Sequence, residues 1–364
     1  MCGIVGAASQ RNIYKILIEG LRRLEYRGYD SAGLSILDNA QVLQTRKTIG
    51  RVADLEKLTA QQSISGNTGI SHTRWATHGE PSSINSHPHT SSGVSVVHNG
   101  IIENHDQLRA EVKALGYEIL SATDTEVIAH LVHHQLKTHT DLRSAVEKTI
   151  AKLEGAYALG VISDTQPETV IGARSGSPLV IGLGIDENFI ASDQMALRQV
   201  TDRFVFLEEG DLVEISSASY SIFDQSGSEV KRPIKQLDEK DLIAEKGQYR
   251  HFMQKEIFEQ PTVLANTTAG RIAADHIREA IFGYQAEALF AQTNNIHIVA
   301  CGTSFHSGLV AKYWLEEHTG VPCQVEVASE YRYRTVPVPA GTLFVTISQS
   351  GETADTLAAL RKAK

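Results

Sequence analysis

The chain begins Met1-Cys2-Gly3-Ile4-Val5-Gly6, which places a cysteine directly behind the initiator methionine. Removal of the methionine would leave Cys2 with a free α-amine. The unperturbed pKa of such an amine is about 7.7–8.0, so near neutral pH it can accept the proton of the neighbouring thiol. Ile4 and Val5 favour a buried strand behind it. The stretch predicts an N-terminal nucleophile that carries its own base, with a cysteine at a frayed terminus as the alternative.

Composition limits the class of protein. The chain has 364 residues, of which 41% are hydrophobic, so it can form two or three domains with substantial cores. The net charge is −9 and no basic run occurs, which disfavours nucleic acid and anionic membranes as partners. No apolar run approaches the roughly 18–20 residues that span a bilayer. Three widely spaced cysteines fit reduced thiols, and we expect a cytoplasmic protein.

Hydrophobic periodicity describes the first two thirds of the chain. It predicts helices at 12–26, 108–115, 126–136 and 142–153, and strands at 34–37, 68–73, 94–97, 157–162, 169–172, 178–183, 188–191, 205–208, 211–215 and 221–223. Helices followed by antiparallel strands predict an α+β fold with sheets stacked between helices. Thr123 and Glu126 have the spacing of a capping box at a helix start.

The last third of the sequence has a different pattern. Residues 224–246 are charged and poor in apolar clusters, which predicts a linker, and a helix is expected at 251–259. Two apolar strands, 296–300 and 343–347, each end in a hydroxyl-rich turn before a helix. This repeat is typical of a parallel sheet. We therefore predict a domain at 1–240, a linker and helical entry at 241–290, and a second domain at 291–364.

Polar residues of the first domain suit the cleavage of a carboxamide. Asn99 and the Gly100 N–H can converge as donors where a tetrahedral oxyanion develops. Arg74 can hold a substrate carboxylate with two hydrogen bonds, and Asp124 can pair with a substrate ammonium. An amino acid with a side-chain amide, above all glutamine, fits these charges. Each residue alone has an ordinary alternative, since a lone Arg is usually solvated and a lone Asp usually caps a helix.

Histidines are frequent in the same region and suggest zinc as a second possibility. No acidic or thiol ligand accompanies them at a usual spacing, so polar packing and loop hydrogen bonds are favoured and no metal is expected. The histidines in question are His72, His78, His87, His89 and His98.

Five motifs together resemble the glutaminase domain of class II glutamine amidotransferases, over about residues 1–240. These are Cys2-Gly3-Ile4-Val5-Gly6, Arg27-Gly28-Tyr29-Asp30-Ser31-Ala32-Gly33, His72-Thr73-Arg74-Trp75-Ala76-Thr77-His78-Gly79, His98-Asn99-Gly100-Ile101-Ile102-Glu103-Asn104 and Thr123-Asp124-Thr125-Glu126. The resemblance implies an N-terminal nucleophile hydrolase with a four-layer αββα sandwich. It also implies Cys2 as nucleophile, its amine as base, Asn99 and Gly100 as oxyanion hole, Arg74 and Asp124 as glutamine clamps, Thr77 and His78 as lining of the same loop, and Trp75 as a gate for ammonia.

The hydroxyl-rich turns of the second domain, with two helix N-termini, form a candidate phosphate cradle. Ordinary capping of the two helices is the alternative. The turns resemble the sugar-isomerase (SIS) domain, which binds phosphosugars. That resemblance implies phosphosugar binding by Thr303, Ser304, Ser348, Gln349, Ser350 and Thr353.

A class II glutaminase followed by a SIS domain resembles the isomerizing glutamine–fructose-6-phosphate aminotransferases. The resemblance implies that ammonia from glutamine converts fructose 6-phosphate to glucosamine 6-phosphate, the first step of amino-sugar synthesis. It implies no metal or organic cofactor, and a homodimer of the full-length protein.

This chain is shorter than that family, and its parallel-sheet domain is expected to be incomplete. We expect a fragment that lacks the catalytic residues of the isomerase. Two alternatives remain open. The first is another class II amidotransferase, such as the phosphoribosylamine-forming enzyme or asparagine synthetase, against which the serine-rich second half argues. The second is a non-catalytic sensor of glutamine or a phosphosugar.

Overall fold

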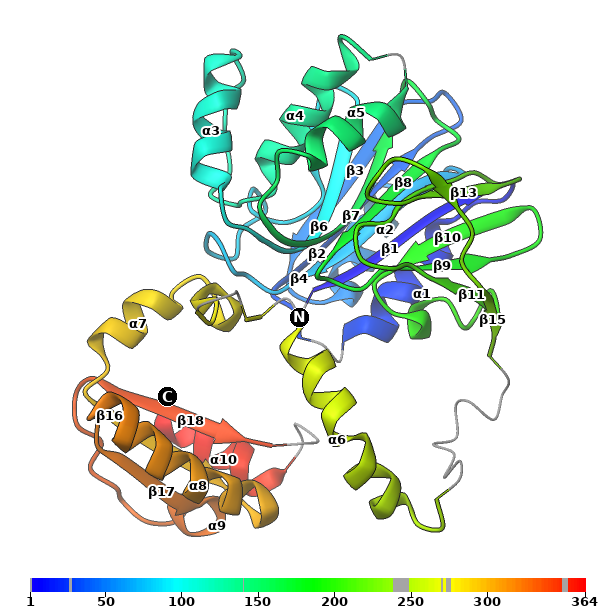
Figure 1. Ribbon diagram of the computed structural model, residues 1–364. Helices are drawn as coiled ribbons and strands as arrows, with labels where there is room; N and C mark the ends of the chain where they lie inside the picture. The colour runs from blue at the N-terminus through cyan, green and yellow to red at the C-terminus, as the bar shows by residue number, and fades with distance from the viewer. Residues whose placement is uncertain are drawn as a thin grey trace. The chain divides into compact units, whose positions relative to one another are not determined.

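The computed structural model (Figure 1) describes residues 2–25, 28–139, 141–237, 249–269, 271–272, 276–348 and 353–364. The chain divides into two compact units, Met1–Tyr284 and Gln285–Lys364. The domain limits predicted from the sequence, near 240 and 290, remain proposals, and each unit is described by itself below.

Two antiparallel sheets form the centre of the first unit. In the described residues, one sheet has eight strands in the order β15 (Ile234–Gln236), β11 (Arg203–Phe206), β9 (Val180–Leu183), β10 (Glu187–Ala191), β1 (Gly3–Ser9), β4 (Thr68–Arg74), β2 (Ser31–Leu37) and β3 (Leu43–Ile49). The other has seven, in the order β14 (Glu229–Val230), β13 (Tyr220–Phe223), β12 (Leu212–Ile215), β8 (Val170–Ser175), β7 (Gly155–Ser163), β6 (Val94–Ile102) and β5 (His89–Ser91).

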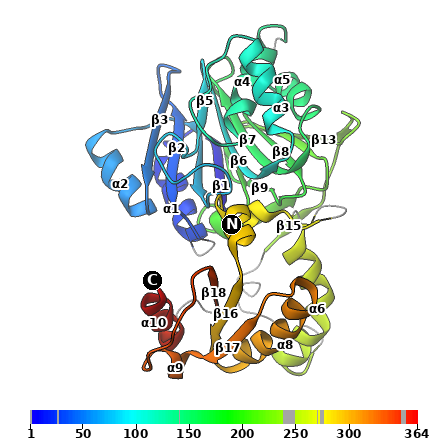
Figure 2. The ribbon, with the colours of Figure 1, turned by 90° about the vertical axis from the view of Figure 1, so that its left-hand side faces the viewer.

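Helices cover the outer face of each sheet (Figures 1 and 2). On the eight-stranded sheet lie α1 (Tyr14–Leu24) and α2 (Val52–Gln61), whose apolar residues share one core with β1 and β2. On the seven-stranded sheet lie α3 (His105–Ala114), α4 (Glu126–Leu136) and α5 (Leu142–Ile150). A third core fills the space between the sheets. These layers confirm the predicted αββα sandwich.

Strand β1 shows why the sheets stack in this way. Successive side chains of a strand point to opposite faces. Ile4 and Ala8 lie in the core between the sheets, whereas Val5 and Ala7 pack in the core beneath α1. Every residue of β1 is buried, so the strand needs apolar or small side chains on both faces.

One expectation for the first unit, the linker at 224–246, was wrong. The segment 224–246 contains β14 and β15, and β15 pairs with β11 at the sheet edge. All three residues of β15 are exposed, so this short edge strand has no buried apolar pattern that would distinguish it from a linker. Residues 238–246 of the predicted linker lie outside the described part. The periodicity also did not reveal β3 or α2.

The capping box predicted for α4 is also absent. The helix begins at Glu126 with Thr125 as its N-cap, and no side chain caps it. The Glu126 carboxylate instead accepts hydrogen bonds from the backbone N–H groups of Leu120 and Ser121, at 2.9 and 2.6 Å. The hydroxyl of Thr123 pairs with His89 of β5. Tertiary partners therefore displaced the local capping pattern.

The second unit confirms the predicted parallel sheet. Its described strands are ordered β17 (Cys323–Val327), β16 (Asn295–Ala300) and β18 (Thr342–Ile347), all parallel, and the sequence did not reveal β17. Helices α7 (Ala286–Gln292), α8 (Gly302–Thr319), α9 (Ala328–Tyr331) and α10 (Ala354–Ala363) complete it. Helix α6 (Phe252–Thr268) belongs to the first unit. None of the described helices is long and apolar enough to cross a membrane.

The central position of β10 generates a stability prediction. Phe189 is fully buried in the core beneath α1, so Phe189→Ala should lower the free energy of unfolding by about 3–5 kcal/mol, as expected for a core cavity. Ile185→Ala is the control, because its side chain is 89% exposed and should change stability by less than about 0.5 kcal/mol. Urea unfolding of both variants measures the difference, and equal stabilities would contradict this packing.

Candidate active site

Strand register brings the N-terminal cysteine to the end of β4. In the β1–β4 pair, Gly3 lies opposite Thr73, so Cys2 comes next to the residues that follow β4. The backbone N–H of Trp75 donates a hydrogen bond to Cys2 Sγ at 3.1 Å. The Trp75 carbonyl oxygen is 3.5 Å from the same sulfur. The predicted nucleophile is thus held by the loop that begins at Trp75.

The seven-stranded sheet contributes the predicted oxyanion donors. Asn99 of β6 donates through Nδ2 to the Cys2 carbonyl oxygen at 3.2 Å. Gly100 follows with φ +136°, and a Cβ there would lie 1.9 Å from the Ala156 carbonyl oxygen. Only glycine therefore fits beside β7 at this position. The structure brings Cys2 and Asn99 together, as the sequence predicted.

Arg74 is a buried residue, 3% exposed, and not a solvated surface arginine. Its Nη2 donates to the carbonyl oxygens of His78 and Gly79, the latter at 2.8 Å. Its Nη1 lies 3.5 Å from Asp30 Oδ1. Among the described residues, Nη1 has no hydrogen-bond partner. A buried guanidinium with an unused donor is suited to a bound anion.

Asp124 is buried at 3% exposure. One carboxylate oxygen accepts a hydrogen bond from the Ile102 N–H at 2.9 Å, and His78 Nδ1 and His98 Nδ1 lie 3.8 and 4.0 Å from the carboxylate. Burial raises the pKa of Asp124, but His98, His78 and the Ile102 N–H outweigh it and the pKa falls below its ordinary value. Asp124 is therefore an anion at neutral pH, and it is not the N-cap that its position suggested.

The pKa of the Cys2 thiol is raised, in contrast to the lowered pKa of Asp124. Burial raises its pKa above the ordinary 9.0, although the hydrogen bond from the Trp75 N–H acts in the opposite direction. The nearby carboxylate of Asp30 raises it further, and Arg74 lowers it. A thiol with a raised pKa is protonated near neutral pH and needs a base to become a nucleophile.

The loop after Arg74 holds the other predicted residues. Trp75 is 42% exposed and its ring packs on Gly28, where a Cβ would lie 2.9 Å from the ring. The hydroxyl of Thr77 lies 3.3 Å from His78 Nδ1. Asp30 Oδ2 accepts a 2.5 Å hydrogen bond from the Ala76 N–H and so anchors the loop. The polar turn around Asp30 was noted in the sequence, but nothing local identified its partner.

The histidines pack against one another within the first unit. His72 stacks on His87 with ring centroids 4.2 Å apart, and His87 lies edge-on to His89 at 4.9 Å. Both His87 and His98 pair with the hydroxyl of Thr125 at 2.9 Å. Within the described ranges, no group of three or more ligand side chains is arranged to hold a metal ion. These ring and hydroxyl contacts are of the polar-packing kind that the sequence favours for His72, His87, His89 and His98.

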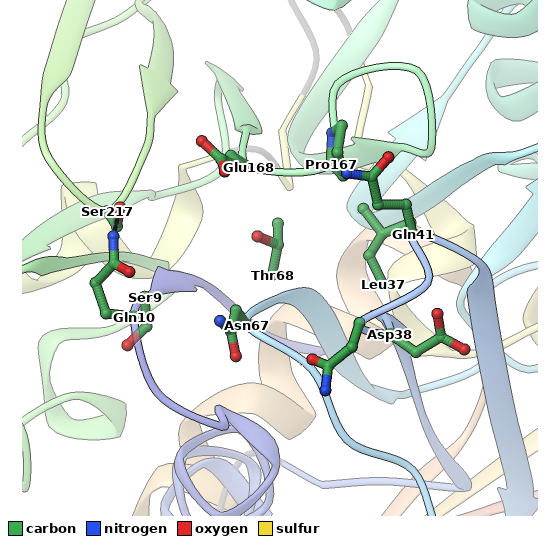
Figure 3. Close-up of a pocket in the computed structure, with 11 residues that line it drawn as sticks. Ser9, Gln10, Leu37, Asp38, Gln41, Asn67, Thr68, Pro167, Glu168 and Ser217 are labelled. Carbon is green, nitrogen blue, oxygen red and sulfur yellow. Dashed lines mark hydrogen bonds between the residues drawn. The ribbon is translucent and has the colours of Figure 1, made fainter.

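A polar cavity of about 210 Å³ lies at the opposite end of β1 (Figure 3). Ser9 and Gln10 line it, together with Asp38 and Glu168. Cys2 precedes the first residue of this strand and Ser9 is its last. The cavity is therefore separate from the thiol site.

The second unit groups part of the predicted phosphosugar site. Thr303 and Ser304 lie in the first turn of α8 after β16, and Ser348 follows β18. Because β16 and β18 are parallel neighbours, these positions share the carboxyl edge of the sheet. Ser348 Oγ lies 3.2 Å from Thr353 Oγ1. In the described part of the chain, neither N-cap residue, Cys301 of α8 nor Thr353 of α10, makes a side-chain capping hydrogen bond. The predicted residues Gln349 and Ser350 lie outside the described part.

The buried histidines generate a prediction for stability against pH. Burial lowers the pKa of His72 and of His89 to about 3, against 6.5 in an unfolded chain. Between these values the unfolded state binds more protons, so stability should fall as pH decreases from 7 to 5, with up to about 1.4 kcal/mol per pH unit for each fully shifted group. Urea unfolding at several pH values measures the slope.

A pair of variants separates the buried histidines from the rest. His89→Gln should reduce the slope of the unfolding free energy against pH by an amount that corresponds to up to about one bound proton, because one buried titrating group is lost. His251→Gln is the control, since His251 is exposed and should leave the slope unchanged. A stability that is flat between pH 7 and 5 would contradict the neutral, buried state of these rings.

Comparison with known proteins identifies the same two kinds of domain that the sequence motifs resemble. The glutamine amidotransferase domain model matches residues 72–199 and the SIS domain model matches residues 289–364. The chain is 60% identical over 365 residues to the isomerizing glutamine–fructose-6-phosphate aminotransferase of Pseudomonas putida and 54% identical over 364 residues to that of Escherichia coli. Each match covers 100% of this chain and 60% of the relative, so the chain spans about 60% of the length of these proteins.

A solved structure supports the fold. Glutamine phosphoribosylpyrophosphate amidotransferase from Bacillus subtilis superposes with a TM-score of 0.57, covering 93% of this chain and 69% of that one at 21% identity. At this identity the likeness concerns the fold alone. Along its whole length, however, this chain resembles the isomerizing glutamine–fructose-6-phosphate aminotransferases, with a class II glutamine amidotransferase domain followed by a SIS domain.

Proposed function

We propose that this chain hydrolyses glutamine at Cys2 to glutamate and ammonia, and that this ammonia supplies the conversion of fructose 6-phosphate to glucosamine 6-phosphate. One observation carries the proposal. The Cys2 sulfur, the Asn99 amide on the Cys2 carbonyl and the unused donor of Arg74 belong to one site between β1, β4 and β6. The 54–60% identity to aminotransferases of that name supports the choice of reaction.

Charge complementarity supports glutamine as the amide. Arg74 Nη1 is buried with an unused donor, so it can bind the α-carboxylate. Asp124 is held ionised by His98, His78 and the Ile102 N–H, so it can bind the α-ammonium. Thr77 and His78 lie on the loop that Arg74 ties down, and we assign them to the wall of the same site.

The chemical step requires a base, because burial raises the pKa of the Cys2 thiol. The α-amine that Met1 removal would expose takes the thiol proton, and the sulfur forms a bond to the carboxamide carbon. Asn99 Nδ2 and the Gly100 N–H donate to the resulting oxyanion. The C–N bond breaks as the ammonium returns its proton, and ammonia leaves. Water then attacks the thioester, the C–S bond breaks, and glutamate is released.

The second unit is assigned to the sugar phosphate. Hydroxyls of Thr303, Ser304, Ser348 and Thr353 lie near the starts of α8 and α10, where backbone N–H groups favour anions. We include Gln349 and Ser350 in this site by resemblance. Trp75, partly exposed beside Cys2, is proposed to gate the passage of ammonia. The cytoplasmic location and the homodimer of the full-length protein remain predictions.

The thiol proposal has a direct test. Cys2→Ala should abolish glutamate formation because the nucleophile is lost. A short N-terminal tag should do nearly the same, because it converts the basic amine to an amide. Glutamate and amino sugar are measured separately with glutamine and fructose 6-phosphate present. Glutamate formation at the wild-type rate by the alanine variant would refute the assignment.

A second test concerns the carboxylate clamp. In the Cys2→Ala background, where glutamine is not consumed, Arg74→Ala should weaken glutamine binding about tenfold or more, since a charge-assisted hydrogen bond contributes roughly 1.5–3 kcal/mol. Titration calorimetry measures the affinity. Arg11→Ala is the matched control, because Arg11 pairs with Glu187 at the far end of β1 and should leave binding unchanged. Equal affinities of the Arg74 and Arg11 variants would contradict this placement.

A further inference from the structure

His72 occupies a position that the proposed mechanism does not yet use. It lies near the end of β4, opposite Ile4 of β1 and Gly33 of β2, and is fully buried. Its ring reaches across to the other sheet. Nε2 is 2.9 Å from the His98 carbonyl oxygen and 3.0 Å from Asn99 Oδ1. His72 therefore connects the strand that leads to Arg74 with the strand that carries Asn99.

The two partners of Nε2 determine which ring nitrogen carries the proton. A carbonyl oxygen and an amide oxygen only accept hydrogen bonds, so Nε2 must be the donor. Nδ1 is buried and has no hydrogen-bond partner among the described residues. A proton on Nδ1 would therefore leave a buried donor unsatisfied as well as placing the Nε2 lone pair against two oxygens. The neutral ring with Nε2–H is the form that fits, and burial holds the pKa of His72 at about 3.

This donor determines how the Asn99 amide is oriented. With Oδ1 held by His72, Nδ2 is the group on the Cys2 side and donates to the Cys2 carbonyl oxygen at 3.2 Å. Rotation of the amide by half a turn would bring Nδ2 against the Nε2–H and Oδ1 against the Cys2 carbonyl oxygen. Both new contacts would be repulsive. The side of Asn99 that faces the nucleophile is therefore a donor side.

We propose that His72 is a positioning residue for amide hydrolysis at Cys2, because its Nε2–H holds the Asn99 amide with the N–H donors toward the developing oxyanion. The inference rests on the proposed glutaminase function. His72 itself touches neither the sulfur nor the substrate in this role. It acts through Asn99, and its loss should lower the rate of the chemical step without removing the groups that bind glutamine.

Kinetics of two variants test the role. His72→Phe keeps a planar ring but removes the donor, whereas His72→Gln keeps an N–H donor on a flexible side chain. Loss of one oxyanion donor lowers kcat by about 10²–10³, which is the upper limit expected for His72→Phe. We expect kcat for glutamine hydrolysis to fall at least tenfold in the Phe variant with KM changed less than threefold, and to recover substantially in the Gln variant.

A double-mutant cycle separates positioning from general damage to the core. In an Asn99→Ala background, His72→Phe should cause no further loss of kcat, because the amide that it orients is absent. His89→Phe is the matched control, since it is an equally buried ring that pairs with Thr123 and not with Asn99. Equal losses from His72→Phe in both backgrounds, or the same kcat loss in the His89 variant, would overturn the proposal.

A measurement on the ring does not depend on activity. Nitrogen-15 NMR of the ring of His72 should show Nε2 protonated and Nδ1 bare between pH 6 and 8. Crystal structures of both variants, at a resolution that distinguishes the amide nitrogen from the oxygen, should show Asn99 in its present orientation only with Gln at position 72. A proton on Nδ1 would overturn the inference even if glutamine is hydrolysed. If the wild type does not hydrolyse glutamine, the proposed function fails, while these data still decide the orientation of Asn99.

Discussion

The antiparallel pairing of β1 with β4 and β10 is the constraint on which this structure depends. Cys2 lies directly before Gly3, the first residue of β1, so the position of Cys2 follows from the position of that strand. The pairing of Gly3 with Thr73 brings the sulfur to the Trp75 N–H. A slip by one residue would turn Ile4 and Ala8 out of the core between the sheets. Burial on both faces therefore fixes the register, and the register places Cys2 beside Trp75.

The site is polar although it lies among buried strands. Each ionised group there has a partner: Arg74 lies beside Asp30 and two loop carbonyls, and Asp124 lies beside two imidazoles and a backbone N–H. In such surroundings satisfied hydrogen bonds are stronger and unsatisfied groups are costly. Among the described residues, Arg74 Nη1 has no hydrogen-bond partner although it lies beside Asp30, and His72 Nδ1 and His98 Nε2 are also buried without one.

The two units contain different kinds of sheet, and their candidate site residues lie at different places on those sheets. The antiparallel sandwich holds Cys2 directly before the start of β1, a strand that is ordered by pairing on both sides. The parallel sheet places hydroxyl-bearing turns at one edge, beside helix starts. A structure only 21% identical shares the fold over most of the chain. A fold shared at such low identity does not by itself define a reaction, which depends on the side chains of the site.

The sequence by itself determined the elements with strong periodicity, the cysteine at position two and the motif residues around Arg74, Asn99 and Asp124. These signals are local, because a strand, a helix or a glycine turn depends on neighbouring residues. The edge strand β15 lacked such a signal since its residues are exposed, and the capping pattern at Thr123 was overridden by partners in β5 and the preceding loop.

Only the tertiary structure decided how the local pieces meet. Cys2 and Trp75 are 73 residues apart, and Cys2 and Asn99 are 97 apart. No pattern in either segment specifies the other, because the pairing results from the burial of whole sheets. His72 is a further example, because the sequence indicated only polar packing for this residue, whereas the structure places its Nε2 on Asn99 Oδ1. The sequence therefore determined which groups are available, and the stacking of two sheets decided which of them touch.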